Sequence, residues 1–300
     1  MLRWRLTLGV VFVAALVALC WLDAQASRPG VYLAGLAIVI AALAAGEMRR
    51  LYRQRGVKLS NSAVYMGALL PVIISSVPIF FPILQLNPTL GCAGWLGMGL
   101  VFGLMSALAG EMRRYDAPGQ SIINVAHDSL TVLYIGGLVG LLVQLRLVNA
   151  PNDIGGWRGL YPLLATIATV KLSDIGQYAV GRTIGKHKLA PLISPGKTWE
   201  GAVGGIILAT LIAAVAMATL NQGTRGLRPS YFLMVWGFTL TVAVAGLLGD
   251  LAESLLKRDA GVKDSSDWMP GFGGVLDLLD SILFAAPVAY MWWVIGILGP

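Results

Sequence analysis

The chain has 300 residues, of which 57% are hydrophobic and only 12% are charged, and its mean hydropathy is +0.75. A soluble domain of this length could not bury so much apolar surface in one core, so the composition excludes an ordinary soluble enzyme and predicts an integral membrane protein. The formal net charge of +7 fits an affinity for anionic lipid headgroups, and we do not interpret it as a sign of nucleic-acid binding.

Apolar runs of about 20 residues, the length that crosses the hydrocarbon core of a bilayer, recur along the chain. They predict an all-α, polytopic membrane protein with about nine transmembrane helices, at residues 6–22, 31–45, 62–83, 89–109, 121–145, 160–181, 201–220, 230–249 and 281–298. A secretory signal is the alternative for the first run, because Arg3 and Arg5 precede it and Ala-Gln-Ala follows at 24–26. The length of the run favours a retained helix.

Lysine and arginine collect in alternate loops between these runs. Sixteen of the 22 Lys and Arg residues fall on one side and five on the other, while Lys171 lies inside a span. Because cytoplasmic loops retain such residues, the pattern predicts a cytoplasmic N-terminus and a C-terminus outside. We expect the protein in the cell inner membrane, with its active site facing the cytoplasm.

The two halves of the chain differ in polarity. We interpret residues 1–120 as an N-terminal transmembrane scaffold of about four helices. Residues 121–300 are predicted to form a C-terminal catalytic region with cytoplasmic loops at 182–200 and 250–280. The scaffold carries Gly-Glu-Met-Arg-Arg twice, at 46–50 and 110–114. We interpret these arginines as headgroup anchors at helix ends, with a duplicated helix pair as the alternative.

The first polar stretch begins with Lys171 and Asp174, which are three residues apart and share one helical face. They either neutralise each other within the bilayer or serve the function directly. Further along, the sequence predicts a helix start with Ser194 as N-cap, Pro195 at the first helical position and Lys197 beside it. A helix N-terminus with a hydroxyl and a lysine favours phosphate binding. The predicted substrate-binding residues here are Asp174, Ser194, Lys197 and Thr198.

The second polar stretch joins the last two spans. Asp250 stands at the end of one span, and Asp277 and Asp280 share one face at the start of the next helix. Three carboxylates that face several cations suit Mg²⁺ held together with substrate phosphates. The predicted catalytic residues are Asp250, Asp277, Asp280, Lys257 and Arg258. The three aspartates are the predicted metal ligands, and Ser254 and Lys263 are predicted to bind substrate.

Four segments of the second half form an ordered set of motifs: Asp-x-Gly-x-Tyr-x-x-Gly-Arg at 174–182, Ile-Ser-Pro-x-Lys-Thr-x-Glu-Gly at 193–201, Ser-x-x-Lys-Arg with Lys-Asp at 254–264, and Pro-Gly-x-Gly-Gly-x-x-Asp-x-x-Asp-Ser at 270–281. With these motifs, residues 171–281 resemble the phosphatidate cytidylyltransferases, also called CDP-diacylglycerol synthases. The last segment departs from the family pattern at two positions, because Phe272 replaces a histidine and Leu278 replaces an arginine.

The resemblance implies that CTP and phosphatidate react to give CDP-diacylglycerol and pyrophosphate. It implies Mg²⁺ as cofactor, with a second cation as an open alternative, and a homodimer that works on membrane lipid. One alternative is a paralogue that binds lipid or nucleotide but has lost or changed the reaction. Another is a membrane transporter, which is disfavoured because the charge gathers at one membrane face and not at the midplane.

Overall fold

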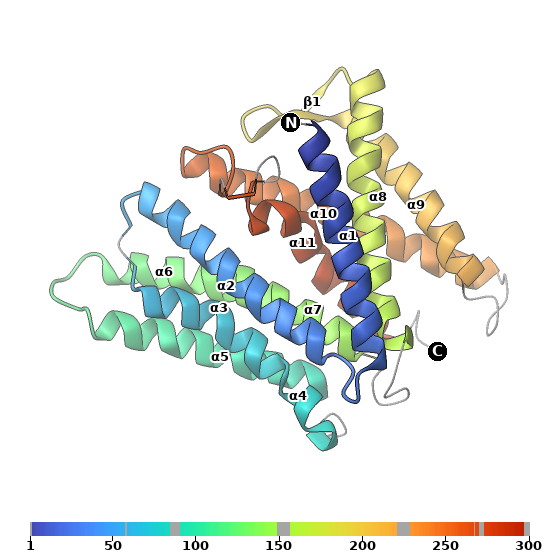
Figure 1. Ribbon diagram of the computed structural model, residues 1–300. Coiled ribbons are helices and arrows are strands. Elements are labelled where there is room, and N and C mark those ends of the chain that lie inside the picture. The colour runs from blue at the N-terminus through green and yellow to red at the C-terminus, as the bar shows by residue number, and fades with distance from the viewer. Residues whose placement is uncertain are drawn as a thin grey trace. The chain divides into compact units, whose positions relative to one another are not determined.

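The computed structural model describes residues 2–57, 59–84, 91–148, 157–220, 229–266, 268–269 and 273–296. Apart from one short hairpin, its regular elements are helices, as Figure 1 shows. The chain divides into two compact units. Unit 1 comprises Met1–Leu160 with Asp259–Leu278, and unit 2 comprises Tyr161–Arg258 with Leu279–Pro300.

Unit 1 is a bundle of apolar helices. Small residues let its helices approach closely: a Cβ added at Gly99 would lie only 2.6 Å from the Cα of Pro71 on the neighbouring helix. Such contacts are typical of helix packing in membranes. The helices of this unit are α1 (Leu2–Gln25), α2 (Val31–Gln54), α3 (Asn61–Ser75), α4 (Val77–Phe80), α5 (Gly91–Met112), α6 (Ser121–Thr131) and α7 (Leu138–Leu147), with a π-helical segment at Val132–Gly137 and 3₁₀ turns at Pro82–Leu84 and Trp157–Leu160.

A buried ion pair fixes the connection between α1 and α2. The Oδ2 of Asp23 accepts a hydrogen bond of 2.8 Å from the Nε of Arg146, whose side chain is almost completely buried. The same carboxylate accepts hydrogen bonds from the backbone N–H groups of Gly30, Tyr32 and Leu33 at the start of α2. Asp23 therefore satisfies helix N–H groups that have no partner within the helix.

Unit 2 contains α8 (Tyr161–Ile184), β1 (Lys188–Ala190), β2 (Ser194–Thr198), α9 (Trp199–Leu220), most of α10 (Pro229–Asp259) and most of α11 (Val275–Val294). Glycines bring α8 and α9 together, since a Cβ at Gly176 would lie 2.9 Å from the carbonyl oxygen of Gly205. The antiparallel hairpin β1–β2 joins these two helices, with Lys188 opposite Thr198.

This hairpin corrects one prediction. Ser194 is not an N-cap and Pro195 is not helical, because residues 194–198 form strand β2 and the helix begins at Trp199. The N-cap is Thr198, whose Oγ1 accepts a hydrogen bond of 3.2 Å from the N–H of Gly201. The Ser-Pro signal was misleading because pairing with β1 extends the backbone of this segment.

Seven helical segments of the described chain are long and apolar enough to cross a membrane, which supports the predicted polytopic fold. Two more helices occupy predicted spans. The apolar part of α1, Gly9–Gln25, is shorter than these seven, and α8 contains Lys171 and Asp174. The candidate spans are Val31–Gln54, Asn61–Phe80, Gly91–Met112, Ser121–Leu147, Trp199–Met217, Tyr231–Asp259 and Val275–Val294.

Candidate active site

Unit 2 gathers five charged residues from four elements, and we call them the lysine–aspartate cluster: Lys171, Asp174, Lys197, Asp250 and Asp280. The Nζ of Lys197 on β2 lies 2.6 Å from the Oδ2 of Asp250 on α10. On α8, the Nζ of Lys171 lies 3.4 Å from the Oδ2 of Asp174, as their spacing predicted. Asp280 interacts repulsively with Asp250 and Asp174, and attractively with Lys171. Three carboxylates therefore share one region with two lysines.

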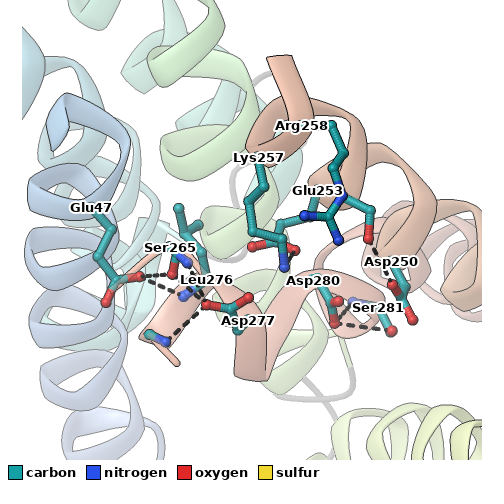
Figure 2. Close-up of polar contacts among 12 residues, drawn as sticks. Glu47, Asp250, Glu253, Lys257, Arg258, Ser265, Leu276, Asp277, Asp280 and Ser281 are labelled. Atoms are coloured by element: carbon teal, nitrogen blue, oxygen red, sulfur yellow. Dashed lines mark hydrogen bonds and ion pairs between the residues drawn. The ribbon is translucent and has the colours of Figure 1, made fainter. Parts of the chain in front are cut away.

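Close packing of α10 against α11 positions the cluster's aspartates. A Cβ at Gly249 would lie 2.8 Å from the Cβ of Phe284, so only glycine fits beside Asp250 without a shift. The Oδ1 of Asp280 accepts hydrogen bonds from the backbone N–H and the hydroxyl of Ser281, as the dashed lines in Figure 2 show. Asp280 is only 8% exposed. A carboxylate held in this way is preorganised to face an incoming cation.

Other predicted site residues on α10 already have protein partners. Lys257 forms an ion pair with Glu253, one turn earlier on the same helix, and Glu253 is 1% exposed. The Nε of Arg258 donates a hydrogen bond of 3.2 Å to the carbonyl oxygen of Ile193, which lies in the turn of the hairpin. The hydroxyl of Ser254 donates to the Oδ1 of Asp250 over 3.4 Å. These contacts connect α10 to the hairpin that carries Lys197.

Glu200 organises the basic loop between α8 and β1. Its carboxylate accepts hydrogen bonds from the backbone N–H groups of Lys186 and His187 and contacts the Nδ1 of His187 at 2.5 Å. Because Glu200 is in the first turn of α9, it also complements the positive end of that helix. The Glu of the Lys-Thr-x-Glu-Gly segment therefore holds the loop in place.

Asp277 lies in unit 1, at the start of α11, where it forms a helix cap. Its Oδ2 accepts hydrogen bonds from the N–H of Ser265 at 2.9 Å, the hydroxyl of Ser265 at 2.6 Å and the N–H of Gly274 at 2.9 Å. Gly274 is the residue just before α11 and Asp277 is its third residue, so the hydrogen bond from the N–H of Gly274 to Asp277 is half of a capping box. Asp277 therefore has a structural role, and its role as a metal ligand stays a prediction.

Glu47 on α2 is a buried capping residue that the sequence interpretation missed. Its carboxylate is 5% exposed and accepts four hydrogen bonds within unit 1. The donors are the N–H of Val275, the N–H of Leu276, the indole N–H of Trp268 and the hydroxyl of Ser265, at 2.9–3.0 Å. The single proton of that hydroxyl is shared between Glu47 and Asp277. Figure 2 shows Glu47 directed at Ser265 and Leu276. Glu47 thus caps the helix on which both Asp277 and Asp280 lie.

A signal for Glu47 was present in the sequence. No ionisable residue other than Tyr32 precedes it within α2, and an acid inside an apolar helix is a candidate for function. The interpretation of residues 46–50 as a headgroup anchor rests on the arginines alone.

The remaining predicted residues are placed as follows. Ser194 is on β2, opposite Ala190, and is partly exposed. Lys263 is exposed in unit 1, Leu278 lies on α11 in the same unit, and Phe272 is outside the described residues. Within the described chain, no three Asp, Glu, His or Cys residues are already arranged to hold a metal ion.

Comparison with known proteins identifies the family of this chain. A model of the cytidylyltransferase family matches residues 3–295, nearly the full chain. The chain belongs to the cytidylyltransferase family.

Individual members of the family are similar over shorter stretches. The chain is 44% identical to a phosphatidate cytidylyltransferase of Haemophilus influenzae over 149 residues, which cover 49% of each chain. It is 38% identical over 166 residues to a phosphatidate cytidylyltransferase of Bacillus subtilis, covering 55% of this chain and 57% of the relative. A third, from Staphylococcus saprophyticus, is 42% identical over 130 residues, covering 43% of this chain and 48% of the relative. The chain thus spans about half the length of the curated relatives it matches.

Proposed function

We propose that the chain is a phosphatidate cytidylyltransferase, which joins CTP and phosphatidate into CDP-diacylglycerol and releases pyrophosphate. The lysine–aspartate cluster is the observation that carries this proposal. Three of its residues, Asp174, Lys197 and Asp280, come from the segments that resemble the family. The cluster combines carboxylates that favour a cation with lysines that favour phosphates. The family membership and the names of the relatives support the same reaction.

In this reaction a phosphate oxygen of phosphatidate attacks the α-phosphorus of CTP in line. A new P–O bond forms to the lipid phosphate, the bond between the α-phosphorus and the bridging oxygen breaks, and that oxygen leaves with pyrophosphate. No protein nucleophile is required, so the residues act by orienting two anionic substrates and by neutralising their charge. Lys197 fits this role, since it is only partly buried and projects from the hairpin into the cluster.

The cluster fits a divalent cation. Asp250, Asp280 and Asp174 repel one another, and Lys171 and Lys197 compensate only part of their charge. Mg²⁺ prefers carboxylate oxygens and keeps several ligands from water and substrate phosphates, so an incomplete set of protein ligands suits it. We propose Asp250 and Asp280 as its ligands in unit 2, and Asp277 as the ligand from the neighbouring turn of α11. When bound, Mg²⁺ would neutralise charge on the phosphates and assist the leaving group.

The other predicted residues receive narrower roles in this proposal. Lys257, Arg258 and Lys263 would bind phosphate oxygens, and the first two would exchange their present partners, Glu253 and the carbonyl of Ile193, for substrate. The hydroxyls of Ser194, Ser254 and Thr198 would line the substrate site. Thr198 and Ser254 also act indirectly, by capping α9 and by donating to Asp250.

The finer membrane arrangement is likewise a proposal. We infer that α1 and α8 cross the bilayer with the seven candidate spans, which gives nine crossings, a cytoplasmic N-terminus and an external C-terminus. The uneven distribution of Lys and Arg supports this orientation. The lysine–aspartate cluster would then lie at the cytoplasmic face of the cell inner membrane, where CTP is available. Residues 121–300 would provide the catalytic region of a homodimer.

Substitution of Asp250 tests the function of the cluster. Asp250→Asn keeps the shape of the side chain but removes a charged metal ligand, so formation of CDP-diacylglycerol from labelled CTP should fall by about 100-fold or more. Asp259→Asn is the matched control, because Asp259 is on the same helix but forms an exposed ion pair with Arg55. Activity of Asp250→Asn above about a tenth of wild type, at saturating Mg²⁺, would remove Asp250 from the metal role.

A further inference from the structure

A basic cavity lies in unit 1, on elements that contribute no residue to the lysine–aspartate cluster. A cavity of about 380 Å³ is lined by Arg49, Tyr52, Arg53, Gly56, Val57 and Leu59. These residues are the last turns of α2 and the segment that follows it. The volume falls within the range of small-molecule sites, about 300–1,000 Å³.

The chain turn after α2 forms one wall of this cavity. Gly56 has a φ of +74°, a conformation that favours glycine, and the N–H of Val57 donates to the carbonyl oxygen of Tyr52 at 3.1 Å. This is the hydrogen-bond pattern of a helix that ends at a glycine. It turns the backbone so that Val57 and Leu59 line the same cavity as the two arginines.

Among the described residues, neither arginine side chain that lines the cavity has a hydrogen-bond or ion-pair partner. The Nε of Arg49 is buried without a hydrogen-bond partner, and no hydrogen bond or ion pair joins the guanidinium of Arg53 to another described residue. Two arginines nearby in the sequence do have protein partners: Arg50 donates to the hydroxyl of Ser266, and Arg55 forms an ion pair with Asp259. Arg49 and Arg53 are four residues apart on one helix, a spacing at which like charges repel. An anion between them would remove both the repulsion and the unsatisfied donor.

The position of the cavity indicates what kind of anion binds. Arg49 lies about 27 Å along the helix from Val31, at 1.5 Å per residue, and the hydrocarbon core of a bilayer is about 30 Å thick. The guanidinium groups therefore lie at the depth of lipid headgroups. Arginine presents a planar fork of donors that matches phosphate oxygens. The aliphatic walls, Val57 and Leu59, suit the part of a lipid that adjoins its headgroup.

We propose that Arg49 and Arg53 bind the phosphate group of an anionic phospholipid in this cavity. Its lining residues belong to α2 and the segment that follows it, so the cavity shares no residue with the lysine–aspartate cluster. This proposal gives a lipid-binding role to Arg49, the first arginine of the Gly-Glu-Met-Arg-Arg segment at 46–50. The equivalent arginine of the second segment, Arg113, is exposed and does not line this cavity.

The test is a binding titration of the purified full chain in non-ionic detergent with dioleoyl-phosphatidylglycerol, read by native mass spectrometry without CTP. Its phosphate is a diester, not the monoester of the proposed substrate, so the result does not depend on the proposed reaction. The Arg49→Ala, Arg53→Ala double variant should bind this lipid about tenfold more weakly or worse, because it loses charge-assisted hydrogen bonds. Arg113→Ala should stay within about twofold of wild type.

Several results would overturn the proposal. These are unchanged binding by the double variant, an equal loss in Arg113→Ala, or equally tight binding of dioleoyl-phosphatidylcholine by the wild type. Inorganic phosphate that displaces the lipid at equal concentration would show a site for free phosphate instead. If the double alanine variant does not fold, as judged by gel filtration, Arg49→Gln with Arg53→Gln replaces it, and the same loss is expected.

Discussion

Glu47→Ala should destabilise unit 1 strongly, although the residue lies far in sequence from the helix it caps. The substitution removes four accepted hydrogen bonds and leaves the N–H groups of Val275 and Leu276 buried without a partner. Each unsatisfied buried donor costs about 1–3 kcal/mol. Part of this loss is offset because a buried carboxylate no longer has to be desolvated. We therefore expect a net loss of about 3–5 kcal/mol in the free energy of unfolding.

The assay is thermal unfolding of the purified protein in detergent, followed by its tryptophan fluorescence. A loss of this size should lower the Tm by roughly 5–10 °C in a chain of this length. Glu111→Ala is the matched control, because Glu111 occupies the same position in the second Gly-Glu-Met-Arg-Arg segment but accepts one described hydrogen bond, from Asn124. Its Tm should fall by about 2–3 °C at most. A Glu47→Ala variant that unfolds within about 1 °C of wild type, or no earlier than Glu111→Ala, would refute the reasoning.

Three other predictions concern the candidate site and the core of unit 1. Lys197→Ala should raise the KM for CTP or phosphatidate about tenfold, whereas Lys188→Ala on the opposite strand should leave the KM unchanged. Equal KM values for the two variants would show that Lys197 pairs with Asp250 but does not bind substrate. Asp23→Asn should cost about 3–5 kcal/mol because the cation of Arg146 stays buried, and an unchanged Tm would show that this pair is not required. Chelation of Mg²⁺ should abolish turnover and its return should restore it, so activity that persists in excess chelator would argue against a metal-assisted reaction.

The membrane character and most helix positions could be predicted from composition and hydropathy, because apolar length is a local property of the sequence. The ends of helices were harder. The span predicted at 31–45 continues as α2 to Gln54. The span predicted at 230–249 continues as α10 to Asp259. In both cases polar residues extend the helix beyond the apolar run. A hydropathy pattern does not register such an extension.

The pairing of site residues shows the same limit. The ion pair between Lys171 and Asp174 follows from helix periodicity and is confirmed. The contact between Lys197 and Asp250 depends on a hairpin that pairing and packing stabilise, and the Ser-Pro sequence at 194–195 favoured a helix start instead. Glu47 contacts residues more than 200 positions away, so no local pattern could assign its partners.

Incorporation of radiolabelled CTP into chloroform-extractable lipid tests the central claim most directly. Purified wild-type protein, supplied with phosphatidate and Mg²⁺, should form labelled CDP-diacylglycerol, and omission of phosphatidate should abolish the signal. The Phe272→His, Leu278→Arg double variant, which restores the two residues of the family pattern, should be active as well at equal amounts of folded protein. Absence of product from the wild type, together with clear activity in the double variant, would contradict the claim and identify the chain as a paralogue that has lost the reaction.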